Sequence, residues 1–338
     1  MHGHLPGLDG VRAIAVLMVV AGHASRFPDF PEAARALMVV NIAHLGVVVF
    51  FVLSGFLITT LLVSERDRTG RVSLRDFYAR RTIRIFPAAF AFIGVVALAA
   101  RAGLVVLAPG DILHAVTYTM NYHHERAWAL GHLWSLAVEE QFYLLWPLVF
   151  VRSGRRAVIV AMLVLVAAPL LRVAGWMLVP AARVGIDEQF QFVCDALATG
   201  CVLALLAHHV GLQRLGAMVP GWGVLMAIVA VFASAYASGR VSFYLPLGAT
   251  IVNVAIAVCI LWVVTHPSTL AGRALNSWIA VAIGVMSYSI YLWQQPFLDA
   301  EAGGAALWTR LLLVLMAAMA SYWVLERPLL ALRRKYRR

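Results

Sequence analysis

Apolar residues are gathered into ten long stretches along the chain, and this pattern predicts a helical membrane protein. A helix needs about 20 mostly apolar residues to cross a hydrocarbon core of about 30 Å. The stretches lie at 8–25, 37–63, 85–107, 132–151, 156–179, 190–208, 218–236, 243–265, 277–299 and 305–325. A further stretch, 111–122, is short and polar at its ends, so it predicts a re-entrant or interfacial segment. The expected count is ten, with eleven as the alternative.

The composition agrees with this pattern. The chain has 338 residues, of which 62% are hydrophobic and 13% are charged, whereas soluble domains are roughly half apolar and a quarter charged. We therefore expect an all-α fold, a polytopic membrane helix bundle that forms a single transmembrane domain over residues 1–338. The lipid bilayer is its expected partner, and no stretch predicts a soluble domain.

The excess of positive charge predicts an orientation in the membrane. The chain has 27 Lys and Arg residues against 16 Asp and Glu residues. With the N-terminus inside, 18 of the basic residues fall on the inner side and six in outer loops. This asymmetry is typical of membrane insertion and does not indicate a nucleic-acid partner. We expect both termini in the cytoplasm and the protein in a bacterial inner membrane. Because Lys335 is the only lysine, we also expect a GC-rich bacterial genome.

Ionisable residues inside the predicted spans mark a functional site, because each costs about 2.5–3.5 kcal/mol at mid-bilayer on insertion scales. Arg12 and His23 are eleven residues apart, which places them about 16 Å apart on nearly the same helix face. Glu139 lies at about the depth of His23. On a helical wheel it shares a stripe with Ser135 and Tyr143.

Further polar residues fall at a comparable outer depth, namely Asp195, Tyr291 and Gln294. A single buried His or Asp is often a packing residue with a satisfied partner. The shared depth instead favours a buried reaction or transport site. The loop residue Arg126 was expected in solvent, and the glycines at 46 and 55 in close helix packing.

The cytoplasmic side has a second group of charges. Arg81 and Arg84 are three residues apart, so they share one face of a helix. One interpretation is anchoring to anionic lipid, and the other is a clamp for phosphate groups, which Arg binds in a bidentate manner. No metal site is expected, because Cys194, Cys201 and Cys259 fall within spans without a CxxC motif.

Several motifs, in the right order, resemble the acyltransferase-3 family of bacterial integral membrane acyltransferases. They are "GLDGVRAIAVLMVVAGHAS" at 7–25, "GVVVFFVLSGFLIT" at 46–59, "ARRTIRIFP" at 79–87, "HLWSLAVEEQFYLLWP" at 132–147, "SYSIYLWQQPF" at 287–297 and "ERPL" at 326–329. The resemblance covers essentially the whole chain. Two positions depart from the family pattern: Val49 or its neighbour stands where an acidic residue is common, and Gln294 stands where many members have His.

The resemblance implies an O-acyltransferase that takes an acyl group, by default acetyl, from cytosolic acyl-coenzyme A. The group is delivered to a hydroxyl of a cell-envelope or extracellular carbohydrate, or of a lipid-linked glycan. Aligning the motif places the key carboxylate at Glu139, in agreement with the helical wheel. The sequence indicates the sugar O-acetyltransferase type without an appended esterase-like domain.

A mechanism follows from these residues as a hypothesis. His23 is the expected general base or acyl carrier, because an imidazole exchanges its proton near neutral pH. Glu139, within hydrogen-bond reach, would orient the imidazole. Arg12, together with Arg81 and Arg84, would contact the coenzyme. The expected substrate-binding residues are Tyr143, Ser135, Tyr291, Gln294 and Asp195.

The alternative function is a proton-coupled transporter or flippase of a glycan or lipid-linked sugar, since such proteins also carry intramembrane His, Glu, Asp and Arg residues. The hydropathy pattern shows no pair of broken helices, a feature of many carriers. The sequence leaves open the acceptor, the acyl group, whether His23 is acylated, and the oligomeric state.

Overall fold

A computed structural model describes residues 5–36 and 38–329, and within these residues every regular element is helical. The expected all-α class is confirmed. The predicted start of the second span at residue 37 and the basic residues beyond Leu329 lie outside the described residues.

The longer helices correspond in order to the predicted spans. They are α1 (Leu8–Ala24), α3 (Ile42–Thr69), α4 (Leu74–Arg101), α7 (Leu133–Ser153), α8 (Ala157–Leu178), α9 (Phe190–Leu206), α11 (Gly221–Tyr236), α13 (Ala249–Thr265), α16 (Ser287–Phe297) and α17 (Leu307–Ser321). Shorter helices connect or extend them. These are α2 (Glu32–Ala36), α5 (Asp111–Val116), α6 (Trp128–Gly131), α10 (Leu212–Ala217), α12 (Val241–Phe243), α14 (Leu270–Leu275) and α15 (Trp278–Val285).

Seven of the described helices are long and apolar enough to cross a membrane, which makes the protein a multi-pass membrane helix bundle. One of the seven, Trp128–Leu178, contains both α7 and α8, and therefore two of the predicted spans. Helix α1 has 17 residues, just below the length required. The exact count of ten stays a prediction. The stretch 111–122 forms only α5 and a short 3₁₀ turn, so it does not cross.

Two predicted spans differ from the structure. Helix α4 begins at Leu74 rather than at 85, because the Ser73 hydroxyl accepts a hydrogen bond from the Asp76 amide and caps a polar first turn. The ninth span is broken at Met286 into α15 and α16. The hydropathy pattern did not reveal this break.

The centre of the bundle is held by close contact between α3 and α9. A Cβ atom on Gly55 would lie 1.9 Å from the Leu197 carbonyl oxygen, and one on Gly200 would lie 2.0 Å from the Val52 carbonyl oxygen. Only glycine permits this approach, and small residues serve the same purpose at many helix crossings in membranes. The predicted packing role of Gly55 is confirmed.

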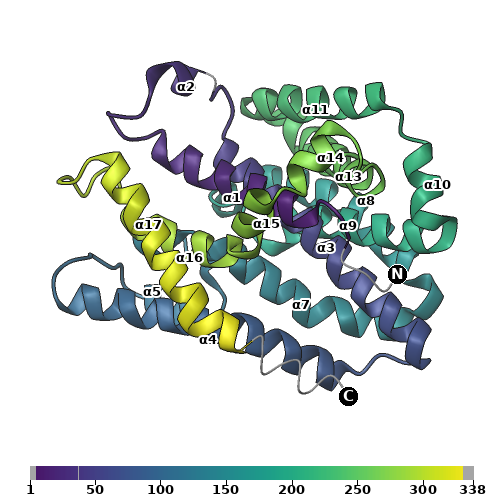
Figure 1. The fold of residues 1–338 in the computed structure, drawn as a ribbon, viewed down its shortest axis with the longest axis horizontal. Coiled ribbons are helices and arrows are strands. Elements are labelled where there is room, and N and C mark those ends of the chain that lie inside the picture. The colour runs from purple at the N-terminus through teal and green to yellow at the C-terminus, as the bar shows by residue number, and fades with distance from the viewer. Residues whose placement is uncertain (1–4, 37, 330–338) are drawn as a thin grey trace.

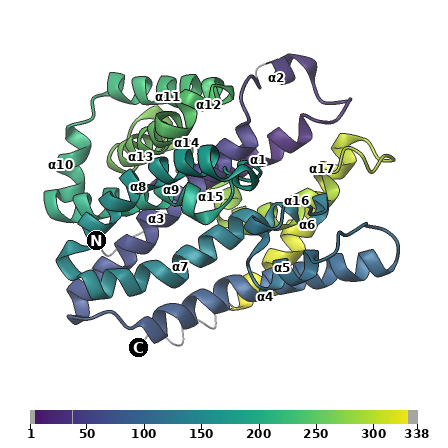
Figure 2. The same cartoon turned by 180° about the vertical axis from the view of Figure 1, so that it is seen from behind.

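The arrangement separates two sides and two ends. In both views α4 and α7 run side by side along one side of the bundle, α11 lies on the opposite side, and α3, α9 and α13 lie between them (Figures 1 and 2). The connection from α3 to α4 lies at one end. Helix α2, the end of α4 and the loop before α17 lie at the other. Under the predicted orientation the second end faces outward, and this orientation stays a prediction.

Candidate active site

A cavity of about 260 Å³ opens near the end of α1 and the start of α3, at the end of the bundle predicted to face outward. Helices α1, α3, α6, α7 and α16 and two outer connections form its wall. Its lining side chains are mostly planar and polar or aromatic: His23, Asn41, His44, Arg126, Trp128, His132, Trp134, Asp187, Glu188, Tyr291 and Gln295.

His23 is partly buried on the cavity wall, and its imidazole is held on two sides. Its Nδ1 lies 2.7 Å from Oε1 of Gln294, to which it donates a hydrogen bond. The ring of Trp128 meets it edge-on, with the ring centroids 5.1 Å apart. Because Nδ1 carries the proton, Nε2 keeps a lone pair and can take a proton from a hydroxyl group in the cavity.

A second imidazole, that of His132, lies in the same wall at the start of α7. Its Nε2 donates to the Leu292 carbonyl oxygen at 3.0 Å, and its own carbonyl accepts from Tyr291 Oη at 3.0 Å. The hydroxyls of Ser135 and Tyr291 are 2.5 Å apart. These bonds tie α7 to α16 and fix the face of α7 that the sequence predicted to point inward.

The same stripe of α7 continues to a deeper group of charges. Glu139 is seven residues beyond His132, about 10 Å along the helix. Its Oε1 accepts a hydrogen bond from the Ser54 hydroxyl at 2.5 Å, and the Tyr143 hydroxyl donates to Ser54 at 2.9 Å. The guanidinium of Arg81 lies 3.6 Å from the centroid of the Tyr143 ring. Glu139 therefore lies on the predicted stripe of α7, and its side chain is directed toward α3 and α4.

The expected contact between His23 and Glu139 is not formed. Within the described residues, His23 pairs with Gln294 and Glu139 pairs with Ser54. His23 and His132 both line the cavity, whereas Glu139 does not and is about two helical turns further along α7 than His132. The residue that orients the imidazole is thus Gln294, a position at which the sequence departs from the family pattern.

Two arginines, Arg12 and Arg81, act on the deeper group. Arg81 and Arg12 both act electrostatically on Glu139, and Arg81 also acts on Glu140. Arg12 forms a 3.3 Å ion pair with Asp9, one turn earlier in α1. One carboxylate oxygen of Glu140, the residue after Glu139, is buried without a hydrogen-bond partner in the described part of the chain. The structure therefore brings Arg12, Arg81 and Glu139 together.

Arg84 lies one turn further along α4 than Arg81 and acts electrostatically on Glu326 at the end of the α17 region. The Ser289 hydroxyl donates to the same Glu326 carboxylate. Arg81 and Arg84 thus share the inward face of α4, as their spacing predicted.

Asp195 lies outside the cavity lining. Both of its carboxylate oxygens accept hydrogen bonds from the Arg172 guanidinium, at 2.9 and 3.0 Å, and Thr250 donates to one of them at 2.9 Å. The Asp195 side chain is 1% exposed and that of Arg172 is 4% exposed. Asp195, which was predicted to bind substrate, therefore forms an ion pair between α8 and α9 and has no accessible carboxylate oxygen.

Arg126 is also placed differently from its prediction. It lies on the cavity wall, where its Nη2 contacts the two carboxylate oxygens of Glu188 at 2.5 and 2.6 Å. A solvated loop was expected because the surrounding sequence is polar, and no local pattern indicated Glu188. Sequence reasoning also missed Ser54, the hydrogen-bond partner of Glu139, since a serine at that position reads as a small packing residue.

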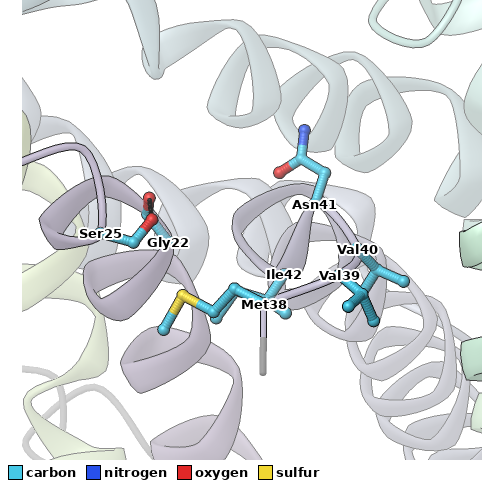
Figure 3. Close-up of a pocket in the computed structure, with 7 residues that line it drawn as sticks. All are labelled: Gly22, Ser25, Met38, Val39, Val40, Asn41 and Ile42. Carbon is cyan, nitrogen blue, oxygen red and sulfur yellow. Dashed lines mark hydrogen bonds between the residues drawn. The ribbon is translucent and has the colours of Figure 1, made fainter. Parts of the chain in front are cut away.

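A second, more open groove adjoins the cavity. The end of α1 and residues 38–42 form it, with Met38 extending toward Ser25 and the amide of Asn41 pointing away from the other labelled residues (Figure 3). Asn41 lines both hollows. Among the described residues, no group of three or more His, Cys, Asp or Glu side chains is placed to hold a metal ion.

Comparison with known proteins agrees with these features. The model of the acyltransferase domain family Acyl_transf_3 matches residues 5–327. O-acetyltransferase OatA of Staphylococcus aureus (strain NCTC 8325) is 33% identical over 332 positions, which cover 87% of this chain and 51% of that protein. Putative peptidoglycan O-acetyltransferase YrhL of Bacillus subtilis (strain 168) is 30% identical over 370 positions, covering 97% of this chain and 55% of that protein.

The chain spans about half the length of these curated relatives. No solved structure matches it significantly. The family match nevertheless extends over almost the whole chain and covers the motifs that carried the resemblance up to Arg327, within the last of them. Residues 5–327 are thus an acyltransferase domain, and the chain belongs to the acyltransferase-3 family.

Proposed function

We propose that this protein is an O-acetyltransferase of the bacterial inner membrane. It takes an acetyl group from acetyl-coenzyme A in the cytosol and delivers it to a hydroxyl of a cell-envelope sugar, with peptidoglycan as the first acceptor to test. The observation that supports this most strongly is His23, which lies on the wall of the outward cavity with its Nδ1 held by Gln294. The names of the relatives, both O-acetyltransferases, support the reaction type.

The proposed reaction starts at Nε2 of His23. This nitrogen takes the proton of the sugar hydroxyl as the oxygen attacks the thioester carbonyl. The C–S bond then breaks, and the leaving thiolate takes the same proton back from Nε2, which restores neutral His23. Gln294 keeps the proton on Nδ1, so the reactive lone pair stays on Nε2. Acyl transfer by way of the imidazole itself is the alternative route and uses the same nitrogen.

The deeper charges are assigned to the donor. Arg12 lies eleven residues, about 16 Å, before His23 on α1. Arg81 and Arg84 line the inward face of α4. Guanidinium groups bind phosphate oxygens strongly, so the anionic end of the coenzyme would lie near these arginines and its thioester near His23. Glu139 is given a positioning role here, because Arg81 and Arg12 both act electrostatically on its carboxyl group.

Replacing Gln294 with leucine is expected to lower kcat about five- to tenfold with little change in the KM for either substrate. The hydrogen bond to His23 is lost, and one such bond contributes about 1 kcal/mol. Gln294→Glu keeps an acceptor at Nδ1 and should retain most of the activity. Steady-state kinetics of both variants check this. If Gln294→Leu raised KM without lowering kcat, Gln294 would be a substrate contact instead.

Arg81→Ala and Arg84→Ala are each expected to weaken acetyl-coenzyme A binding about tenfold or more, since each removes a charge-assisted contact to phosphate. The measurement is a binding titration on the purified protein in detergent. Arg75→Ala is the matched control, because Arg75 lies on the same helix but is exposed. If all three variants bound acetyl-coenzyme A with equal affinity, Arg81 and Arg84 would have structural or lipid-binding roles instead. If the folded wild-type protein did not bind acetyl-coenzyme A at millimolar concentration, the alternative function as a transporter or flippase would be favoured.

A further inference from the structure

The ion pair of Arg126 and Glu188 lies on the cavity wall that holds His23 and serves no step of the proposed reaction. It joins two outer segments, the one before α6 and the one before α9. The Arg126 side chain is 14% exposed and that of Glu188 is 19% exposed. Arg126 is also fixed from behind, because its Nη1 donates to the His123 carbonyl oxygen at 2.9 Å. The pair is thus rigid and open to the cavity.

Comparison with the buried pair between α8 and α9, Arg172 and Asp195, shows what distinguishes it. Arg172 uses all three of its nitrogens, with partners that include two backbone carbonyls, and Asp195 accepts from both Arg172 and Thr250. Within the described residues, Nε of Arg126 has no hydrogen-bond partner and is not enclosed, and both oxygens of Glu188 accept from a single nitrogen. The cavity pair therefore keeps a free donor and free lone pairs.

The surroundings of the pair indicate the chemistry of its ligand. Trp128 and Trp134 contribute aromatic atoms to the lining, and Asp187, Asn41 and Gln295 add hydrogen-bonding groups. A sugar ring has hydroxyls that both donate and accept, and apolar C–H faces that pack on aromatic rings. The volume, about 260 Å³, is slightly below the 300–1,000 Å³ of typical small-molecule pockets, so one ring fits better than several.

We propose that Arg126 and Glu188 form the acceptor-binding pair of the cavity, which takes one polyhydroxylated sugar ring. The free Nε–H of Arg126 donates to one hydroxyl, and Glu188 accepts from its neighbour. Held in this way, the ring presents a third hydroxyl to Nε2 of His23. This inference rests on the proposed function and adds to it the residues that select which hydroxyl reacts.

A purely structural latch between the two outer segments would use the same pair, and a charge exchange separates the two roles. In the double variant Arg126→Glu with Glu188→Arg an ion pair can still form, so a latch would be retained. In this variant, however, the hydrogen-bond donor and acceptor groups that would contact a bound sugar exchange places. Glu188→Gln is the milder second variant, which keeps the size of the side chain but weakens its acceptor strength.

The experiment measures transfer of labelled acetyl from acetyl-coenzyme A to muramidase-released disaccharide fragments of peptidoglycan, together with hydrolysis of the donor without acceptor. We expect the KM for the fragments to rise about tenfold or more in both variants, with donor KM and donor hydrolysis unchanged and the acetylated position altered in the product. Glu301→Gln, the same change at an exposed carboxylate of another outer loop, should match the wild type.

The acceptor-binding role would be overturned if both variants had the wild-type KM for the fragments. It would also be overturned if Glu188→Gln raised this KM and the charge-exchange variant had the wild-type value. If the wild type itself transferred no acetyl to the fragments while still binding the donor, the proposed acceptor would fail first, and the inference with it. The two failures are therefore distinguished by the wild-type reaction in the same assay.

Discussion

Replacing His23 with alanine is expected to lower acetyl transfer about 10²- to 10⁴-fold while the protein stays folded. This range is typical for the loss of a general base, and an acyl-carrying imidazole would cost at least as much. The side chain is partly buried on a cavity wall and makes one hydrogen bond, to Gln294, so its removal leaves no buried charge. His23→Gln keeps a polar side chain but cannot take the proton, and it should be equally inactive.

The measurement is initial rates of transfer with the purified variants, together with their thermal melting in detergent. His209→Ala is the matched control, since this imidazole is exposed and lies outside the cavity lining. It should keep wild-type rates. Activity within a factor of a few of the wild type in folded His23→Ala would remove this residue from the reaction and with it the assigned role of Gln294.

The second large effect concerns stability. Asp195→Ala is expected to destabilise the protein by about 3–5 kcal/mol, because it leaves the buried guanidinium of Arg172 without its counter-charge. The double variant Asp195→Leu with Arg172→Met removes both charges and should recover most of this loss. Thermal melting in detergent reports the order of the three proteins. At temperatures where Asp195→Ala is folded, its KM for the sugar should equal that of the wild type.

Asp67→Ala provides the comparison for this result. Asp67 pairs with Arg66 at 3.9 Å with half of its side chain exposed, and an exposed pair contributes about 0–1 kcal/mol. Its melting temperature should therefore change little. A stable Asp195→Ala variant with a raised KM for the sugar would instead place Asp195 in the acceptor site, as the sequence suggested.

The helical periodicity was sufficient to find the inward faces. Ser135, Glu139 and Tyr143 were placed on one stripe of α7, and all three point to neighbouring helices in the structure. The same holds for Arg81 and Arg84 on α4. Such predictions succeed because a regular helix fixes the angle between its residues, and a charged side chain in a membrane has to face protein or water.

The hydrogen-bond partners that residues find on neighbouring helices could not be predicted from periodicity. The depth estimate placed His23 and Glu139 at one level, but an offset of about two turns is enough to give His23 to Gln294 and Glu139 to Ser54. That offset depends on helix tilt and on where each helix begins. Tilt is set by packing against neighbouring helices and not by the apolar length of the span.

The break between α15 and α16 and the Arg126–Glu188 pair have a related cause. The residues around Met286 are as apolar as those of an unbroken span, so hydropathy gives no signal. Arg126 and Glu188 are 62 positions apart in connections whose path is set by the helices they join. A single sequence carries no record of such contacts.

The most direct test of transfer across the membrane uses proteoliposomes that contain labelled acetyl-coenzyme A, with peptidoglycan disaccharide fragments added outside. The purified wild-type protein is compared with His23→Ala, and labelled fragments are measured in the external medium before and after detergent. We predict labelled fragments outside the intact vesicles for the wild type, and none above background for His23→Ala. Labelling that required detergent, or that was equal in the two proteins, would contradict a cavity in which His23 passes a cytosolic acetyl group to an outer sugar.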